Sequence, residues 1–383
     1  MINILKKQEC SGCYACTNIC PKECIRMKSD NEGFWYPDID KDTCINCELC
    51  EKVCPVINNP NKAENKINAY ACKNKDNKSR NASSSGGVFS LLCDYVISKN
   101  GVVFGVAFDE NFNVKHMHAE TLEECEKFKG SKYIQSKIGS TYKQAKEFLD
   151  NKRIVLFSGT QCQIKGLNLY LRKSYDNLIS IDIVCHGVPS PKVFRMYKEI
   201  LVEKYKSDIK EVRFRDKVNG WKEFSCIAEF KNGKMYSKSA KEDIYMKGFL
   251  KDLYLRPSCY ECKAKNFLSA SDISLADYWG VENIHPEFDD DKGTSLVLVN
   301  SRKGEVMFRK ISSSMDIIKT NLDYAISCNP CIVGPVKYNP KREQFFSEYN
   351  KKNIEKTIQK YTKVTPIQKI KGKIFGILRY INK

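Results

Sequence analysis

The chain has 383 residues, of which 42% are hydrophobic and 29% charged, a composition that excludes a disordered or collagen-like protein. No run of about 18 uncharged apolar residues occurs, which argues against a transmembrane helix. The first residues lack the apolar core of a signal peptide, so we expect a cytoplasmic protein whose 19 cysteines are metal ligands or catalytic thiols rather than disulfides. No nucleic-acid-binding signature accompanies the net charge of +18, and nucleic acid is not an expected partner.

Two cysteine runs of identical spacing, C-x2-C-x2-C-x3-C-P, lie 34 residues apart in the first 60 residues. This spacing predicts two 4Fe-4S clusters, each bound by three cysteines of one run and the last cysteine of the other. Two four-cysteine zinc sites fit less well, because such sites use separated C-x2-C pairs. The expected ligands are Cys10, Cys13, Cys16 and Cys54 for one cluster, and Cys44, Cys47, Cys50 and Cys20 for the other.

Between the runs, the aromatic segment that begins at Gly33 predicts a hairpin that covers the clusters. Residues 1–60 therefore resemble a small, duplicated bacterial-type ferredoxin domain, whose function is one-electron transfer. The polar segment Asn58–Lys66 predicts a linker to a second part.

In residues 61–340, predicted strands and helices alternate, which favours an α/β domain with a mixed sheet and an overall α+β or α/β class. We expect strands at residues 67–73, 101–108, 113–119, 153–157 and 178–184, and helices at 87–99, 122–128 and 140–150. Cys162 and Cys185 follow two of these strands, where ligands of open α/β sheets bind. With the pair Cys259 and Cys262 they make four thiols, enough for one cluster or zinc site, although each thiol is also compatible with a small buried hydrophobe.

Five motifs occur in an order that resembles the family of coenzyme F-420 hydrogenase/dehydrogenase beta subunits, fused to an N-terminal dicluster ferredoxin: residues 84–87, 132–136, 158–163, 182–189 and 259–280. The resemblance implies an iron–sulfur flavoprotein that holds FAD and passes electrons between clusters and the deazaflavin coenzyme. It also implies that a third 4Fe-4S cluster is bound by Cys162, Cys185, Cys259 and Cys262. The chain departs from the family at Gln161, where proline is common.

Several polar segments are candidates for binding FAD. The Ser-Gly run before the helix predicted at 87–99 suits a pyrophosphate, or serves only as an ordinary helix cap. The segment that begins at Lys132 offers a cation, an aromatic ring and amides, or is a solvated loop, and the remaining candidates are alternatively turn residues. The candidate cofactor-binding residues are Ser84, Ser85, Gly86, Gly87, Lys132, Tyr133, Gln135, Ser136, Gly159, Thr160 and Asp277.

His186 is the candidate catalytic residue, because a histidine in a cofactor loop can orient a ligand or donate a proton near neutral pH. A structural role is the alternative. The pair Cys328 and Cys331 has no second pair with which to complete a metal site. The isolated cysteines are interpreted as structural: Cys24, Cys72, Cys93, Cys125 and Cys226.

These features predict an iron–sulfur flavoprotein oxidoreductase that passes electrons between 4Fe-4S clusters, FAD and a two-electron partner, which is coenzyme F-420 or another small substrate such as a sugar intermediate. Ferredoxin or a hydrogenase or dehydrogenase subunit is the expected redox partner. One alternative is a non-catalytic electron-transfer subunit of a hydrogenase or formate dehydrogenase, and another is a redox-sensing protein without flavin. Residues 341–383 predict a basic amphipathic helical tail that packs on the domain, docks an acidic partner or contacts a membrane weakly.

Overall fold

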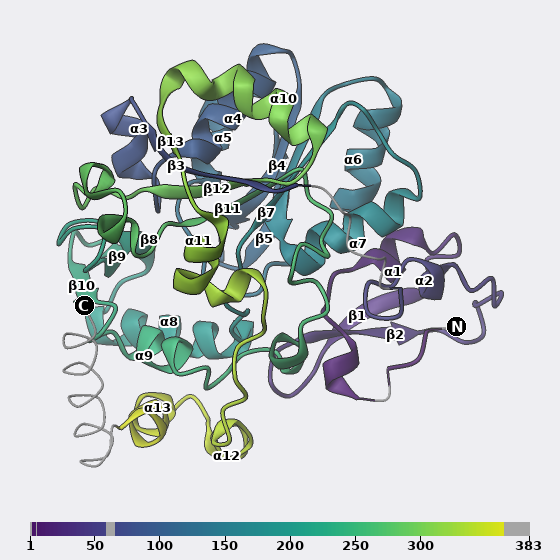
Figure 1. Ribbon diagram of the computed structural model, residues 1–383. Coiled ribbons are helices and arrows are strands. Elements are labelled where there is room, and N and C mark those ends of the chain that lie inside the picture. The colour runs from purple at the N-terminus through teal and green to yellow at the C-terminus, as the bar shows by residue number, and fades with distance from the viewer. Residues whose placement is uncertain (1, 5, 59–65, 364–383) are drawn as a thin grey trace.

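The computed structural model describes residues 2–4, 6–58 and 66–363, which form a small N-terminal part beside a larger α/β part (Figure 1). In these ranges no helix combines the length and the apolarity needed to cross a membrane. The boundary expected near residue 60 and the amphipathic helix expected within residues 364–383 lie outside the described residues.

The larger part is built on an eight-stranded sheet in the order β13-β3-β12-β11-β7-β6-β4-β5. Four neighbouring strands, β11, β7, β6 and β4, run parallel, and antiparallel strands flank them on both sides, so the predicted mixed sheet is confirmed. The strands are β3 (Asn68–Asn74), β4 (Val102–Phe108), β5 (Val114–Ala119), β6 (Val155–Thr160), β7 (Leu178–Ile183), β11 (Ile273–Asp277), β12 (Ser295–Val299) and β13 (Met315–Lys319).

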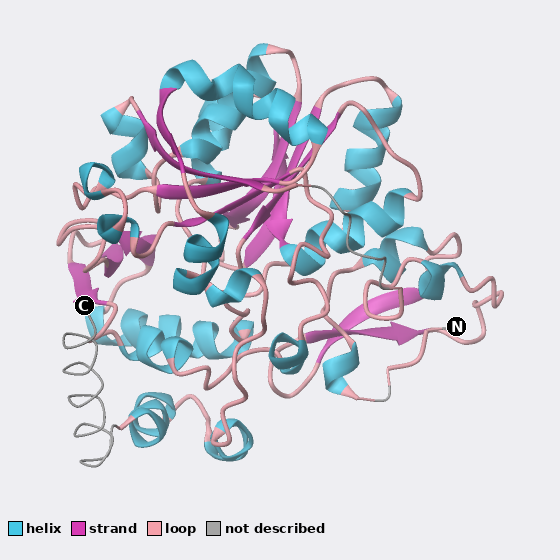
Figure 2. Cartoon of the chain, in the orientation of Figure 1, coloured by secondary structure: helices cyan, strands magenta, loops and turns pink. Residues whose placement is uncertain are grey.

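Helices cover both faces of this sheet, which gives three layers (Figure 2). One face is buried by α4 (Val88–Ser98), α5 (Leu122–Cys125) and α10 (Arg302–Ile311). The other is buried by α6 (Thr141–Asp150), α7 (Gln161–Leu171) and α11 (Leu322–Cys328). A short helix, α3 (Asn77–Ala82), precedes α4. Apolar side chains alternate between two cores along the central strands, as in Val102 and Val103, because both faces are covered.

A second core forms around a three-stranded antiparallel sheet of β8 (Ile209–Asp216), β9 (Ser225–Phe230) and β10 (Met235–Ser239). Four helices contribute to it: α8 (Pro191–Tyr205), α9 (Ile244–Leu250), α12 (Arg342–Glu348) and α13 (Ile354–Thr362). Residues 342–362, which the sequence assigns to the tail, thus bury apolar side chains such as Ile354 and Ile358 in this core.

The N-terminal part consists of the hairpin β1 (Ile25–Ser29) and β2 (Trp35–Ile39) and two short helices, α1 (Ala15–Ile19) and α2 (Leu49–Lys52). The predicted hairpin is confirmed. Its aromatic residues Phe34 and Tyr36 lie against the guanidinium of Arg256, in the larger part. The hairpin turn docks at the start of α8, where Ser190 donates a hydrogen bond to the carbonyl oxygen of Glu32.

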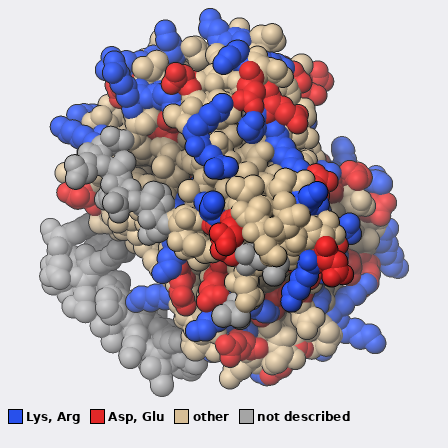
Figure 3. All heavy atoms as spheres, turned by 90° about the vertical axis from the view of Figure 1, so that its right-hand side faces the viewer, with Lys and Arg blue, Asp and Glu red and all other residues tan. Residues whose placement is uncertain are grey.

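Lys and Arg side chains alternate with Asp and Glu on the side of the molecule that carries the N-terminal part (Figure 3). The excess of basic residues therefore forms no continuous patch of one sign on this face. A face of mixed charge offers no extended positive track of the kind that follows a nucleic-acid backbone.

Helix α7 packs directly against the first cysteine run. A Cβ at Gly166 would lie only 3.0 Å from the Cβ and 3.1 Å from the Sγ of Cys13. Only the absence of a side chain at Gly166 lets the cysteine loop approach the helix this closely.

We therefore expect Gly166→Val to overpack this contact and to lower the stability of the folded chain by about 1–3 kcal/mol. The measurement is the midpoint temperature of thermal unfolding under anaerobic conditions. Gly334→Ala is the matched control, because a Cβ there has its nearest neighbour at 3.8 Å. Equal midpoints for both variants would show that the contact with Cys13 is not tight.

Candidate functional site

The two cysteine runs have the same local backbone geometry. In each run a residue in the left-handed region, Tyr14 (φ 64°) or Glu48 (φ 59°), follows the second cysteine and begins a short helix that carries the third. Because this turn redirects the chain, the cysteines of one run face a common side. The sequence duplication is therefore a structural duplication as well.

The first expected ligand set lies at the junction between the two parts. Cys13, Cys16 and Cys54 are buried and Cys10 is half-buried, and these thiols interact electrostatically with one another. Burial is the main cause that raises the pKa of Cys13 and Cys54. A raised pKa means that a buried thiolate is unfavourable. Binding to a metal offsets this unfavourable free energy, because the metal supplies the compensating positive charge.

The second expected ligand set lines a hollow of about 360 Å³ that opens to solvent. Its walls include Cys20, Cys44, Cys47 and Cys50, together with Cys24, which the sequence analysis treats as isolated. The Sγ atoms of Cys20 and Cys24 are 3.3 Å apart. The position of Cys24, four residues after Cys20 and directly before β1, was the only available signal for this placement.

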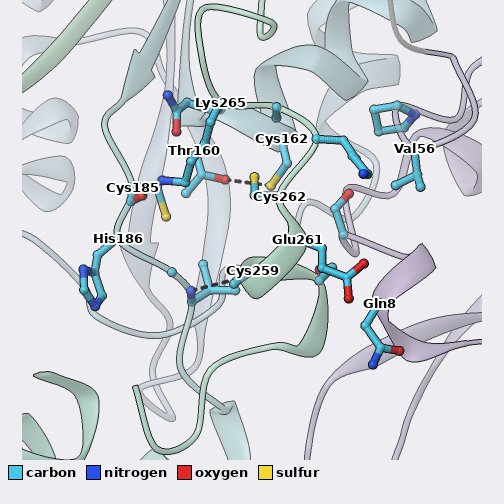
Figure 4. Close-up of a pocket in the computed structure, with 18 residues that line it drawn as sticks. Gln8, Val56, Thr160, Cys162, Cys185, His186, Cys259, Glu261, Cys262 and Lys265 are labelled. Carbon is cyan, nitrogen blue, oxygen red and sulfur yellow. Dashed lines mark hydrogen bonds between the residues drawn. The ribbon is translucent and has the colours of Figure 1, made fainter. Parts of the chain in front are cut away.

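The four remaining candidate ligands meet at the carboxyl ends of two parallel strands. Thr160 at the end of β6 pairs with Ile183 at the end of β7. The first turn of α7, which carries Cys162, and the loop that carries Cys185 therefore leave the same edge of the sheet. Cys259 and Cys262 come from the turn that begins at Pro257. Figure 4 shows the four side chains around one hollow of about 590 Å³, which is open to solvent.

Backbone contacts hold these loops together. Pro189 bridges to Leu255, and the amide of Val188 donates to the Sγ of Cys259 at 3.4 Å. The hydroxyl of Thr160 lies 3.3 Å from the Sγ of Cys162. Amide and hydroxyl groups directed at sulfur are typical of iron–sulfur sites, where they tune the potential of the cluster.

The cysteines surround the hollow rather than converging on a point. Within the described ranges, no three His, Cys, Asp or Glu side chains are arranged to hold one metal ion. Zinc needs all of its ligands on a single ion, whereas each cysteine of a cubane cluster binds a different iron atom.

Two buried lysines flank this hollow and were missed by the sequence analysis. Lys265 donates hydrogen bonds to the carbonyl oxygens of Cys185 and Cys331, and Lys165 donates to that of Lys263. Their side chains interact with cysteines of the hollow, and that of Lys165 also interacts with Cys13. Lysine is so common in this chain that no sequence pattern distinguishes these two.

His186 lies at the rim of the hollow and has two polar partners. Its Nε2 is 2.5 Å from a carboxylate oxygen of Asp252, and its Nδ1 is 3.7 Å from the Sγ of Cys331. Burial lowers the pKa of His186, but the contacts with Asp252 and Cys331 outweigh it and raise the pKa to about 9. The imidazole is therefore charged at neutral pH, and Cys331 belongs to its surroundings.

A large open cleft of about 2270 Å³ lies between the Ser-Gly segment and β8. Two of the flavin-binding candidates, Ser84 and Lys132, line it, together with Arg215 and Lys217. Burial lowers the pKa of Lys132 to about 7, and its ammonium donates to the carbonyl oxygens of Lys127 and Lys129. The cleft thus offers hydroxyl and cationic groups in one place, as a phosphate-bearing ligand requires.

Other candidates near the Ser-Gly segment face the protein. Ser85 donates to the carbonyl oxygen of Thr294, and the amide of Gly86 donates to the hydroxyl of Ser295. A Cβ at Gly86 would lie 2.3 Å from the carbonyl oxygen of Cys72, so the lack of a side chain there serves packing on the sheet. Gly87 adopts φ 82° and begins α4.

The remaining candidates are distributed over the space between the cleft and the hollow. The side-chain amide of Gln135 donates to the carbonyl oxygen of Ser11 in the N-terminal part. The hydroxyl of Ser136 lies 3.2 Å from Nδ1 of the buried His116 and accepts a hydrogen bond from the side-chain amide of Gln163. A Cβ at Gly159 would lie 3.4 Å from the Nε2 of His116. Asp277 forms an ion pair with Arg215 at 3.1 Å.

A row of aromatic contacts joins the hollow to the cleft. The ring of His186 lies 5.4 Å from that of Phe249, and Phe249 lies 4.8 Å from Tyr133. Tyr133 in turn lies 5.8 Å from Phe214, which lines the cleft. The two candidate sites are therefore close neighbours within one fold.

Two protein-family models match separate segments of the chain, one in the N-terminal part and one in the larger part. Residues 9–58 match the 4Fe-4S dicluster domain, and residues 152–324 match the C terminus of the beta subunit of coenzyme F420 hydrogenase/dehydrogenase. The chain is thus similar to this beta-subunit family over residues 152–324, slightly less than half of its length. The resemblance inferred from the ordered motifs is thereby confirmed, as is the iron–sulfur character of the N-terminal part.

Two proteins similar to this chain come from Methanosarcina species. A subunit of the F(420)H(2) dehydrogenase of Methanosarcina mazei is 22% identical over 316 residues, which are 82% of this chain and 73% of the relative. A chain in the xenon-derivatised F420-reducing [NiFe] hydrogenase complex from Methanosarcina barkeri aligns with a TM-score of 0.46 and 16% identity, over 76% of this chain and 90% of its own.

The spacing of the two runs predicts different roles for Cys20 and Cys24, which lie side by side in the hollow of the second ligand set. Cys20→Ala is expected to lose about four iron atoms, because Cys20 closes the spacing of its run. Cys24→Ala is expected to retain its iron, since it removes only a neighbouring thiol. Iron content after anaerobic reconstitution of each variant is the measurement. If Cys24→Ala lost iron and Cys20→Ala did not, Cys24 would be the cluster ligand and Cys20 the neighbouring thiol.

Proposed function

We propose that the chain is an iron–sulfur flavoprotein oxidoreductase that couples one-electron carriers to a two-electron partner, either coenzyme F420 or another small molecule such as a sugar intermediate. The observation that carries this proposal is that both cysteine sets adjoin the same helix, α7. Gly166 of α7 contacts Cys13, and Cys162, one turn earlier in α7, lies on the neighbouring hollow. In this proposal, residues 1–60 are the dicluster domain and residues 61–340 bind flavin and the further cluster.

The proposed third cluster has Cys162, Cys185, Cys259 and Cys262 as ligands. The donor set fits the group, because four sulfur ligands surround a hollow that the buried Lys265 also lines. The directed amide of Val188 and the hydroxyl of Thr160 also fit. These features support a cubane cluster over a zinc ion.

The proposed FAD site is the open cleft. Bound there, FAD would supply the conversion between one-electron and two-electron transfer. Ser84 and Lys132 would hold its phosphates, while Arg215, fixed by Asp277, would add a second positive charge. The row of rings from Phe214 to His186 supports the proposal, because it connects the cleft to the hollow through contacting side chains.

His186 is our candidate for holding a proton at this boundary. Asp252 orients the ring through Nε2 and favours its charged form, so that the proton is retained at neutral pH. A positioned acid of this kind suits a two-electron transfer that is accompanied by a proton.

A second candidate function is an electron-transfer subunit within a larger hydrogenase or dehydrogenase complex. It is favoured by the relative from M. mazei, which is itself a dehydrogenase subunit. Purification of the full chain from its native source distinguishes the two, since a stable stoichiometric partner would favour the subunit and an isolated active chain the enzyme.

The proposal predicts about 12 iron atoms and one FAD per chain, measured anaerobically by iron assay, flavin release and absorption spectroscopy. Cys162→Ala and Cys259→Ala should each lose about four iron atoms, while Cys328→Ala, which lies outside the hollow, should keep them all. About 8 iron atoms and no flavin in the wild-type chain would contradict both the third cluster and the flavin site.

Flavin binding in the cleft predicts a specific effect of charge at Gly130, which lies among Lys127, Lys129 and Lys132. A Cβ there meets no atom within 4 Å, and its positive φ of 79° suits Asp and Asn. Gly130→Asp should weaken FAD binding about tenfold, because the carboxylate repels a phosphate. Gly130→Asn, the isosteric control, should bind nearly as well as the wild type.

The readout is the FAD dissociation constant of flavin-stripped protein, measured at low salt with iron content as a check on folding. Equal constants for the Asp and Asn variants would place the phosphates away from this loop.

A further inference from the structure

Arg256 lies at the centre of the junction between the two parts of the chain. Its side chain is fully buried, and the residue itself stands three positions before Cys259. The amide of Cys259 donates to the carbonyl oxygen of Arg256, so the arginine and the cysteine belong to one turn. The side chain extends from this turn into the N-terminal part.

The guanidinium reaches the loop of the first cysteine run. Its Nε donates to the carbonyl oxygen of Cys10 at 2.7 Å, and one Nη donates to that of Trp35 at 2.9 Å. A Cβ at Gly12 would lie 2.9 Å from the other Nη, so the guanidinium is packed tightly against the loop between Cys10 and Cys13.

The positive charge of Arg256 is not neutralised by a carboxylate. Its third hydrogen bond, at 3.2 Å, is to the neutral amide of Gln135, and its other neighbours are the faces of Phe34 and Tyr36. Among the described residues, no Asp or Glu forms an ion pair with it. Arg342 at the same junction differs, because it is held by the carboxylate of Glu32.

The charge acts on both cysteine sets. On one side the guanidinium contacts the backbone between Cys10 and Gly12. On the other side the turn that begins at Arg256 leads directly to Cys259, whose amide donates to the carbonyl oxygen of Arg256. A buried cation is costly unless negative charge is placed near it, and two cysteine-bound clusters would supply that charge.

We propose that Arg256 is an electrostatic positioning residue that raises the reduction potential of the cluster on Cys10, Cys13, Cys16 and Cys54, and of the proposed centre on its other side. Adding an electron makes a cluster more negative, so a fixed cation nearby stabilises the reduced form. For the second centre, the inference rests on the proposed function. For the first, it rests on the dicluster domain alone.

The test is an anaerobic redox titration of the full chain with dithionite and mediators, followed by electron paramagnetic resonance. Arg256→Met should weaken reduction of the adjacent cluster at least tenfold, a decrease in midpoint potential of about 59 mV for one electron. Arg256→Lys, which keeps the charge, should restore most of the potential. The cluster expected on Cys20, Cys44, Cys47 and Cys50 serves as an internal reference, because the hollow that these cysteines line does not include Arg256.

Arg342→Met is the matched control, because it removes a second buried arginine from the same junction, one that pairs with Glu32 rather than contacting the cysteine loop. It should leave the potentials unchanged. An equal shift in both variants would assign the effect to loosened packing and would overturn the proposal. Unchanged potentials in Arg256→Met with full iron content would overturn it as well.

Gln135→Glu keeps the proposal testable if Arg256→Met loses its iron. It places a carboxylate beside the guanidinium and so cancels the net charge while the arginine stays packed. The adjacent cluster should again become harder to reduce, and an unchanged potential would overturn the proposal. A wild-type count of about 8 iron atoms would remove only the third cluster, since the shift at the first cluster remains measurable.

Discussion

The close contact between the first cysteine loop and helix α7 is the constraint on which the rest of the arrangement depends. Gly166 lets Cys13 lie on the helix, and Cys162 is one turn away, about 6 Å along the helix axis. Because α7 itself directly follows β6 of the central sheet, the contact between Cys13 and α7 places the first cysteine set relative to that sheet. A flexible tether between two independent domains would not provide this, since electron transfer requires a constant short separation.

Burial at this junction is costly in the absence of metal and becomes favourable in its presence. Burial raises the pKa of thiols such as Cys13 and Cys259, so these groups are neutral while Arg256 retains its charge. Metal-bound thiolates would reverse this balance by placing negative charge beside the buried cation. With metal bound at these cysteines, cluster assembly and docking of the N-terminal part would be coupled, as metal binding and folding are in other small metal-binding domains.

Periodicity and spacing were sufficient to predict the mixed sheet, most of its strands and the two cysteine runs, because those features depend on local pattern. The buried cations could not be predicted, since the role of Arg256 arises from residues far away in the sequence, Cys10 and Trp35 among them. Cys24 shows the same limit, because its nearness to Cys20 depends on where β1 begins. Within the Ser-Gly segment, Ser84 lines the cleft while Gly86 packs on the sheet, a difference that a run of small residues does not reveal in the sequence.

Two lysines of the cleft, Lys132 and Lys217, have pKa values that burial lowers, to about 7 and about 8 respectively. Both ammonium groups donate to backbone carbonyl oxygens. These lysines thus hold the surrounding loops together before they meet a ligand. A phosphate in the cleft would favour their charged forms and raise both pKa values, so binding would take up protons at neutral pH. An anion bound beside Lys132 and Lys217 would thus be stabilised by the charge that these two lysines gain, which a neutral molecule at the same place would not induce.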